Sequence, residues 1–321
     1  MSQISGQESS PPNRVERSLL WLNAFWKFSR PHTIVGTSLS VIGLYLISLS
    51  STEFSRAGLG QMLGAWIACL CGNVYIVGLN QLEDVAIDRI NKPHLPLAAG
   101  EFSRATAKAI IIINGCLALL LAWLLGPFLL ATVGISVIIG TAYSLPPIRL
   151  KRFPFWAALC IFTVRGAIVN LGLFLHFNQV HSITPNVWAL TLFVLVFTLA
   201  IAIFKDIPDL EGDRQYNIKT LTIQLGQRTV FELARWVLTV CYLGMILAGV
   251  LWLPTVNSAF LVTTHLLALG LMWWRSRALD LQAEAGLQFT PTSEPYVEFY
   301  QFIWKLFFLE YLIFPAACLL N

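Results

Sequence analysis

Charged side chains are scarce in this chain of 321 residues. Asp, Glu, Lys and Arg make up 12% of it, whereas 56% of the residues are hydrophobic, and a soluble domain usually carries about 25% charged residues. The mean hydropathy is +0.69. One core surrounded by water could not bury so much apolar surface, so the composition excludes a soluble globular protein and predicts helices within a lipid bilayer.

Two further features are missing. The six cysteines have neither the spacing of a zinc site nor that of a disulfide framework, so we interpret them as small apolar helix residues. The 21 Lys and Arg form no dense basic stripe, and the net charge is only +4. A nucleic-acid partner is therefore excluded.

The amino-terminal stretch lacks the pattern of a targeting sequence. No small-residue cleavage site separates it from the first apolar run, and Glu8 and Glu16 are atypical of a transit peptide. We expect residues 1–30 to form a polar cytoplasmic tail, in a bacterial protein or an already processed organellar one.

Long stretches without charge predict where the chain crosses the membrane. About 20 apolar residues make one crossing, and three charge-free windows are each long enough for two crossings and a turn. These windows lie between Lys108 and Arg149, Arg165 and Lys205, and Arg235 and Arg275, with turn residues at 126–127, 182–185 and 254–257. Single spans at 32–49, 62–82 and 299–319 complete an all-α bundle of nine expected transmembrane helices.

The basic residues predict the orientation of these helices. Most of them lie in the amino-terminal stretch and in the loops after the second, fourth, sixth and eighth spans, whereas the opposite loops contain only Arg56. The positive-inside rule places the amino terminus and the long loops in the cytoplasm. We expect residues 31–321 to form a single membrane domain.

A first acidic cluster follows the second span. It reads Asn80-Gln-Leu-Glu-Asp84-Val-Ala-Ile-Asp88-Arg89, and a spacing of four places Asn80, Asp84 and Asp88 on one helical face. Carboxylates beside a membrane span are costly unless they pair with or bind a cation. A positive partner is therefore expected on this face.

A second acidic cluster follows the sixth span. Asp206, Asp209 and Asp213 have spacings of three and four, which again gives one helical face. Both clusters contain Asp-x-x-x-Asp-Arg, and an even number of crossings separates them, so both can face one central cavity open to the cytoplasmic side. We infer a weak internal repeat of four helices.

Paired carboxylate faces suit magnesium. Mg²⁺ prefers oxygen ligands and is usually held by one or two carboxylates together with substrate phosphates, so the two clusters predict a site that grips a diphosphate leaving group. Each cluster alone could instead be a solvated helix end paired with Arg89 or Arg214. An ion-coupled transporter is the alternative of another class, but carriers usually place such groups near the membrane midplane.

The motifs resemble those of the UbiA-type intramembrane prenyltransferases, whose two aspartate-rich motifs follow the second and sixth of nine helices. Longer strings are similar to the homogentisate prenyltransferases of tocopherol and plastoquinone synthesis, and within them to the homogentisate phytyltransferase branch. These strings are residues 80–98, Arg30-Pro31-His32-Thr33, residues 143–151, residues 204–209 and Phe302-Ile-Trp304-Lys305-Leu. The likeness runs from about residue 25 to the carboxyl end.

This resemblance implies a reaction. A prenyl diphosphate, usually phytyl diphosphate, is ionised under Mg²⁺, and its allylic carbon alkylates homogentisate with loss of the acetate carboxyl, which gives a methyl-phytyl-benzoquinol. The magnesium motifs do not separate this activity from geranylgeranyl or solanesyl transfer or from a chlorophyll synthase, because the diphosphate is common to all. A cyanobacterial plasma or thylakoid membrane is the implied location, and the oligomeric state is left open.

The resemblance also implies residue roles. Asn80, Asp84 and Asp88 would hold one Mg²⁺ and the diphosphate. The second set, which would hold the other Mg²⁺, consists of Asp206, Asp209 and Asp213. Glu83 stands where the family often has another residue, and this additional carboxylate has no assigned role.

Other polar residues are candidates for substrate binding. Arg165 lies within the fifth span, so it should face the bundle interior, either as a diphosphate ligand or in a structural pair. Lys205 is a diphosphate ligand or a snorkelling helix end, and Arg149 and Lys151 are diphosphate clamps or part of a basic cytoplasmic turn. His32, at the mouth of the first span, is a candidate for binding the aromatic acid.

We expect Asp84→Ala and Asp209→Ala each to abolish turnover while the protein remains inserted and folded, because each change removes a metal ligand and no packing. Turnover and expression in isolated membranes would be compared with the unchanged protein. Loss of expression would favour purely structural carboxylates at helix ends.

Overall fold

The computed structural model describes residues 13–50, 55–178, 182–207, 221–284 and 294–321. Every regular element within these ranges is helical, as the composition predicts. The helices are, in chain order, α1 (Arg14–Phe28), α2 (Pro31–Leu49), α3 (Arg56–Glu83), α4 (Val85–Asn91), α5 (Arg104–Leu125), α6 (Pro127–Ser144), η1 (Leu150–Arg152), α7 (Pro154–Ile161), η2 (Phe162–Ile168), α8 (Val169–Asn178), α9 (Pro185–Asp206), α11 (Leu221–Leu225), α12 (Gln227–Leu251), α13 (Ser258–Glu284) and α14 (Glu294–Leu319).

Eight helices in the described ranges are long and apolar enough to cross a membrane. They include the continuous helical run α7–η2–α8, and α13 lies alongside them as a further long helix. The expected turns are confirmed, because α5, α8 and α12 end before residues 126, 182 and 254 and the following helices begin after these turns start. Proline opens α2, α6 and α9, since a proline at the first helical position removes a backbone donor that has no partner there.

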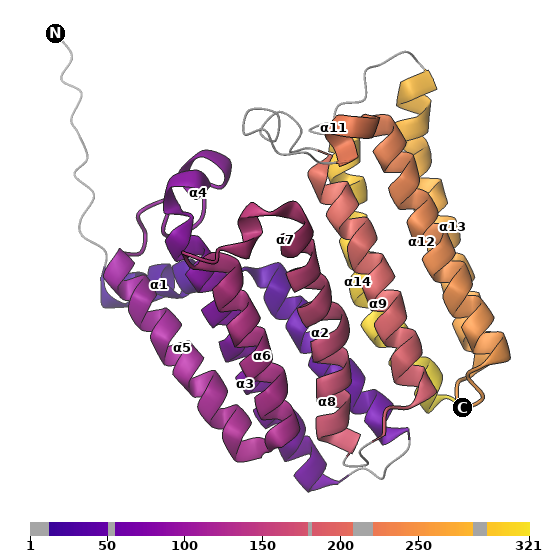
Figure 1. Cartoon of the computed structure of the whole chain (residues 1–321), viewed down its shortest axis with the longest axis horizontal. Coiled ribbons are helices and arrows are strands. Elements are labelled where there is room, and N and C mark those ends of the chain that lie inside the picture. The colour runs from indigo at the N-terminus through magenta and orange to yellow at the C-terminus, as the bar shows by residue number, and fades with distance from the viewer. Residues whose placement is uncertain (1–12, 51–54, 179–181, 208–220, 285–293) are drawn as a thin grey trace.

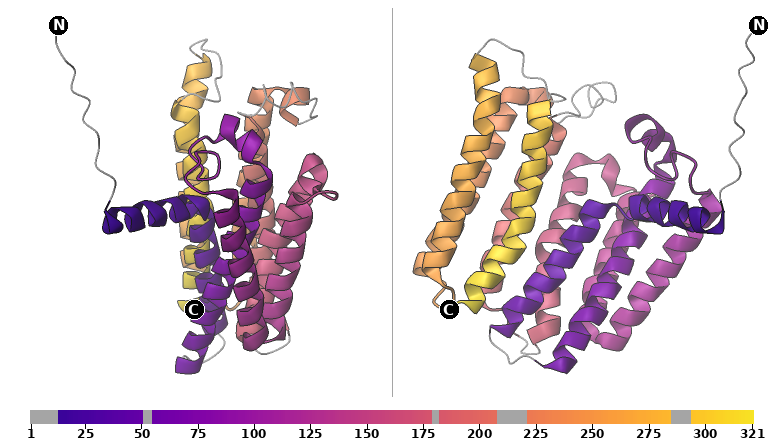
Figure 2. Two further views of the ribbon diagram at one scale, coloured as in Figure 1. Left: turned by 90° about the vertical axis from the view of Figure 1, so that its left-hand side faces the viewer. Right: turned by 180° about the vertical axis from the view of Figure 1, so that it is seen from behind.

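The long helices pack in an order that closes on itself (Figures 1 and 2). Neighbours in this order are α3, α2, α14, α13, α12, α9, the η2–α8 run, α6 and α5, and α5 packs again on α3. Additional contacts of α2 with α8 and of α9 with α14 join the two sides of this order. Most buried apolar side chains belong to one core that runs through these helices.

Aromatic packing fixes the end of α9. The rings of Phe204, Phe231 and Phe299 lie 5.5 to 5.8 Å apart in edge-to-face arrangements, which are favourable for aromatic pairs. The Tyr296 hydroxyl donates a hydrogen bond to the Phe204 carbonyl oxygen at 2.6 Å. These contacts join α9 to α12 and α14 directly before the second acidic cluster begins.

A helix occupies part of the stretch that was expected to be a polar tail. Asn13 caps the start of α1, and its side chain forms a capping box with Glu16. Ala24 and Phe28 of α1 are buried. Figure 2 shows α1 lying crosswise to the long helices. The sequence predicted a polar tail here because polar and charged residues are interspersed among the apolar residues of α1.

The close approach of α2 and α14 gives a prediction of stability. A Cβ atom on Gly43 would lie 2.8 Å from the Tyr311 carbonyl oxygen, and a backbone atom in a packed helix cannot easily move away. We expect Gly43→Ala to lower the free energy of unfolding by about 1–3 kcal/mol, measured as a lower thermal midpoint in detergent. Gly134→Ala is the matched control, because no heavy atom lies within 4 Å of its added Cβ, and equal midpoints for the two variants would contradict the expected clash.

Candidate active site

The first acidic cluster lies where α3 meets α4. Asp84 interrupts the helix with a φ of −107° and a ψ of 14°. The backbone pattern nevertheless continues through it, because the Asp84 amide donates to the Asn80 carbonyl at 3.1 Å and the Asp88 amide donates to the Asp84 carbonyl at 2.8 Å. Asn80, Asp84 and Asp88 therefore follow one another at helical spacing across a kink.

Two basic side chains bind the Asp84 carboxylate. An Arg149 guanidinium nitrogen lies 3.0 Å from Oδ1, and Lys151 Nζ lies 2.6 Å from Oδ2. The Asp84 side chain is only 14% exposed, so the pairs are poorly screened by solvent. Burial lowers the pKa of Lys151, and its hydrogen bond to Asp84 opposes that shift. The structure thus brings together three residues that the sequence assigned to one diphosphate site.

The turn after α6 places these two bases. Arg149 has a φ of +40° at the start of η1, a left-handed conformation that is uncommon for a residue with a side chain. Its amide donates to the Leu145 carbonyl at 2.8 Å. The turn therefore folds back toward α3 and presents both bases to the same carboxylate.

Asp88 has an oxygen without a partner. The residue is 5% exposed, and its buried Oδ2 makes no hydrogen bond to any residue in the described ranges. Burial raises the pKa of Asp88, while the positive charges of Arg30, Lys92 and Lys151 oppose that shift. A buried carboxylate oxygen that lacks a donor is suited to a cation.

The oxygen donors of this cluster fit magnesium. Among the described residues, Asn80 Oδ1 accepts a long hydrogen bond from Arg30 at 3.5 Å, and Asp88 Oδ2 has no partner. Within the described part of the chain, no three His, Cys, Asp or Glu side chains are grouped as a metal site. Two carboxylates and one amide match an ion that takes its remaining ligands from water and substrate phosphates.

The junction between α1 and α2 supplies contacts that sequence reasoning missed. Gln81 is fully buried and its Nε2 donates to the Phe28 carbonyl at 2.7 Å. Asn73 Nδ2 donates to Thr33 Oγ1 at 2.9 Å. The string Arg30-Pro31-His32-Thr33 resembles the family and so indicated that this region matters. The spacing of residues did not predict that this region contacts α3.

The second acidic cluster lies mostly outside the described residues. Asp206 ends α9, the structure does not describe its side chain, and Asp209 and Asp213 fall in the undescribed range 208–220. Lys205, together with Asp84 and Arg30, lies close enough to the Tyr143 hydroxyl to interact with it electrostatically. A meeting of the two clusters stays a prediction.

Arg165 lies in a π-helical segment, η2, against an aromatic wall of α14. Its guanidinium carbon is 5.2 Å from the centre of the Trp304 ring and 5.6 Å from that of Phe307, distances typical of cation–π contacts. The His32 ring meets Trp304 edge-on at 6.0 Å. Arg165 forms no salt bridge with a carboxylate among the described residues. The second role that the sequence allowed, a structural ion pair, therefore has no acidic partner in the described part of the chain.

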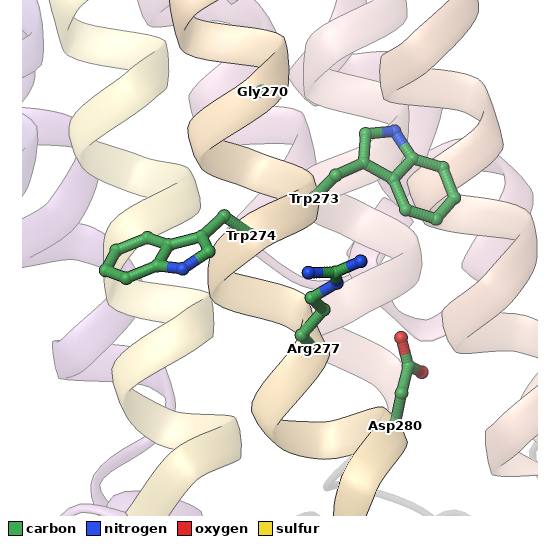
Figure 3. Close-up of a pocket in the computed structure, with 5 residues that line it drawn as sticks. All are labelled: Gly270, Trp273, Trp274, Arg277 and Asp280. Atoms are coloured by element: carbon green, nitrogen blue, oxygen red, sulfur yellow. The ribbon is translucent and has the colours of Figure 1, made fainter.

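A separate hollow of about 470 Å³ lies on α13 (Figure 3). It is lined by Gly270, Trp273, Trp274, Arg277 and Asp280. Asp280 accepts hydrogen bonds from Arg228 at 2.8 Å and Arg235 at 2.7 Å. These contacts join α12 to α13, and we assign the residues to helix packing because no sequence candidate for substrate binding lies among them.

The fold and the site together define an integral membrane protein that gathers carboxylate, amide and basic side chains at one end of its helices. The chain belongs to the UbiA prenyltransferase family, whose model matches residues 39–290.

Individual relatives support this membership. The chain is 55% identical to the homogentisate phytyltransferase of Synechocystis sp., with 92% of this chain and 96% of the relative covered. It is 41% identical to a probable homogentisate phytyltransferase 1 from Oryza sativa, with 98% and 80% covered. The fold is similar to a UbiA homologue from Archaeoglobus fulgidus bound to DMAPP and Mg²⁺, with a TM-score of 0.60, 17% identity, and 92% and 98% covered.

The ion pairs of Asp84 predict a competition between metal and bases. Replacing both bases, as Arg149→Gln with Lys151→Gln, should raise the affinity for Mn²⁺, a spectroscopic substitute for Mg²⁺, because no cation then competes for the carboxylate. The same change should lower the affinity for inorganic diphosphate in the presence of metal by about tenfold or more, since charge-assisted hydrogen bonds are lost.

Both affinities can be measured by electron paramagnetic resonance of Mn²⁺. Arg152→Gln is the matched control, because Arg152 lies on the same turn but donates to the Pro147 carbonyl at 3.2 Å. An unchanged Mn²⁺ affinity in the double variant would show that the bases do not compete with metal for Asp84.

Proposed function

We propose that this protein transfers a prenyl group, with phytyl as the preferred group, from its diphosphate to the aromatic ring of homogentisate. The observation that carries the proposal is the 55% identity to the Synechocystis homogentisate phytyltransferase over nearly all of both chains. In the reaction, the bond between the allylic carbon and the diphosphate oxygen breaks. A ring carbon of homogentisate bonds to the allylic carbon and loses its proton. The acetate carboxylate leaves as carbon dioxide, and the benzylic carbon that remains gains a proton and becomes a methyl group.

Two sets of residues would hold Mg²⁺ in this proposal. The first is the cluster of Asn80, Asp84 and Asp88, and the unpartnered Oδ2 of Asp88 supports it. The second set is Asp206, Asp209 and Asp213. Bound Mg²⁺ would offset the negative charge of the diphosphate and so make it a better leaving group. The Archaeoglobus homologue bound to DMAPP and Mg²⁺ supports this use of a divalent ion.

Basic residues would change partners when substrate binds. Arg149 and Lys151 pair with Asp84 in the structure, and we assign them to the diphosphate oxygens when Asp84 serves as a metal ligand. Lys205, at the end of α9, would contribute a further positive charge. This exchange keeps the carboxylate paired in both states, so the site avoids a buried charge without a partner.

Arg165 and its aromatic neighbours would line the deeper part of the site. We assign Arg165 to the diphosphate and His32 to the aromatic acid. Trp304 and Phe307 lie under the Arg165 guanidinium, and ring faces of this kind stabilise a developing carbocation. Apolar walls also keep water away from the allylic cation, which would otherwise be hydrolysed.

The proposal includes a topology. We assign α13 as a ninth span beside the eight long apolar helices, within one membrane domain of residues 31–321 that retains the four-helix repeat. The positive-inside rule supports a cytoplasmic amino terminus and a cavity open to the cytoplasmic side. A cyanobacterial plasma or thylakoid membrane is the proposed location, supported by the Synechocystis relative.

A donor panel tests the activity. Membranes containing the protein would receive labelled homogentisate with phytyl, geranylgeranyl or solanesyl diphosphate, and the prenylated product and released carbon dioxide would be measured. We expect the highest turnover with phytyl diphosphate and complete loss when a chelator removes Mg²⁺. Membranes with Asp84→Ala are the control. Absence of product from every donor would contradict the proposal, and product from solanesyl diphosphate alone would move it to the plastoquinone branch.

A further inference from the structure

α1 carries an apolar stripe that no described residue covers. Val15, Leu19, Leu22 and Trp26 recur at positions i, i+4, i+7 and i+11, which lie on one face of a helix. Their exposed fractions are 67, 60, 56 and 50%. An isolated exposed leucine is ordinary, but a continuous stripe along a helix indicates a partner surface.

A different face of α1 packs on the protein. Phe28 is fully buried, and its ring lies 5.7 Å from that of Phe102. Trp21 stacks on Phe25 at 5.5 Å and meets Phe102 at 6.0 Å. These contacts fix how α1 is rotated about its axis, so the stripe is a fixed surface that the bundle leaves open.

The position of α1 points to the surface of the bilayer as the occupant of the stripe. α1 lies crosswise to the long helices (Figure 2). It ends at Phe28, and the first membrane span begins at Pro31. A helix that lies in the membrane plane buries an apolar face at the boundary between headgroups and acyl chains, and tryptophan is enriched at that depth.

Charge complementarity specifies the lipid. Arg14 and Arg17 are exposed on α1, and Lys27 forms an ion pair with Glu101 at 2.8 Å. Basic residues on the polar side of a helix at the bilayer surface favour anionic headgroups. In water, the apolar stripe would stay exposed, which is unfavourable.

The end of α1 is joined to the proposed metal site. The Phe28 carbonyl accepts the hydrogen bond from the buried Gln81, and Arg30, two residues further on, reaches Asn80. Movement of α1 away from α3 would break the shorter of the two hydrogen bonds that the Gln81 amide donates and leave only the one to the Val77 carbonyl at 3.3 Å, which is unfavourable for a buried polar group. The orientation of α1 and the position of Arg30 are therefore linked.

We propose that α1 is a membrane-surface helix that buries its apolar stripe in an anionic bilayer surface, with Arg14 and Arg17 on its polar side attracting the headgroups, and that this contact holds Arg30 at the first acidic cluster. The lipid contact stands on the geometry of α1 alone. Its effect on turnover rests on the proposed function.

The lipid contact is tested by the depth of Trp26. The protein would be placed in nanodiscs of phosphatidylcholine and phosphatidylglycerol brominated at shallow acyl positions, and the fluorescence of Trp26 would be obtained by difference from Trp26→Phe. We expect Trp26 to be quenched in the unchanged protein. Leu22→Asp should reduce this quenching severalfold, because it places a charge in the stripe.

Asn23→Asp is the matched control, since it adds the same charge on the neighbouring residue outside the stripe. Its quenching should equal that of the unchanged protein. Absence of quenching in the unchanged protein would overturn the lipid contact, as would a dimer in detergent that Leu22→Asp alone separates, because the stripe would then bind a second copy.

The link to the site is tested by hydrogen–deuterium exchange of residues 28–33, a measurement that needs no turnover. We expect this segment to exchange about tenfold faster in Leu22→Asp than in Asn23→Asp, and faster in the unchanged protein when zwitterionic lipid replaces phosphatidylglycerol. This lipid comparison needs no variant. Equal exchange in both lipids would overturn the link.

Transferase rates in the same nanodiscs separate the two proposals. A rate that falls severalfold with Leu22→Asp and stays unchanged with Asn23→Asp is the expected result, and equal rates for the two variants would overturn the effect on turnover. A protein that is quenched and shows the exchange difference but forms no product would contradict the proposed function and leave the lipid contact standing.

Discussion

The candidate site depends on how charge is held at the end of a membrane span. Asp84 lies in a largely buried position, and the ion pairs with Arg149 and Lys151 hold its charge there. A lone carboxylate at such a place would be unfavourable by several kcal/mol. The kink between α3 and α4 and the left-handed turn at Arg149 place the side chains for these ion pairs. The ion pairs join the second and fourth expected spans.

The same constraint makes the site suited to a doubly charged ion and a diphosphate in the proposed function. Asp88 keeps a buried oxygen that has no donor among the described residues, and the charges of Arg30, Lys92 and Lys151 act on this carboxyl. In the proposed function the carboxylates would attract the metal, and the bases would attract the diphosphate that the metal accompanies. Substrate binding would then exchange the internal ion pairs of Asp84 for pairs with the metal and the diphosphate.

Much of the fold followed from the sequence, because membrane crossings depend on local composition. The charge-free windows and the turns at 126–127, 182–185 and 254–257 were confirmed. The pairing of Asp84 with bases more than sixty residues away depends on how α6 packs against α3, which no local pattern records. α1 was missed because polar residues interrupt its apolar stripe. The contacts of Gln81 and Arg30 could not be predicted either, because they also depend on how distant helices pack.

In the proposed function, the two acidic clusters face each other and hold one diphosphate through divalent ions. The most direct measurement is an experimental structure with Mn²⁺ and a non-hydrolysable prenyl diphosphate, in which anomalous scattering locates the metal. We expect two metal peaks bridged by the diphosphate, one within about 2.0–2.4 Å of oxygens of Asp84 or Asp88 and one beside Asp209 or Asp213. Clusters that point toward lipid, or lie too far apart to share one diphosphate, would contradict it.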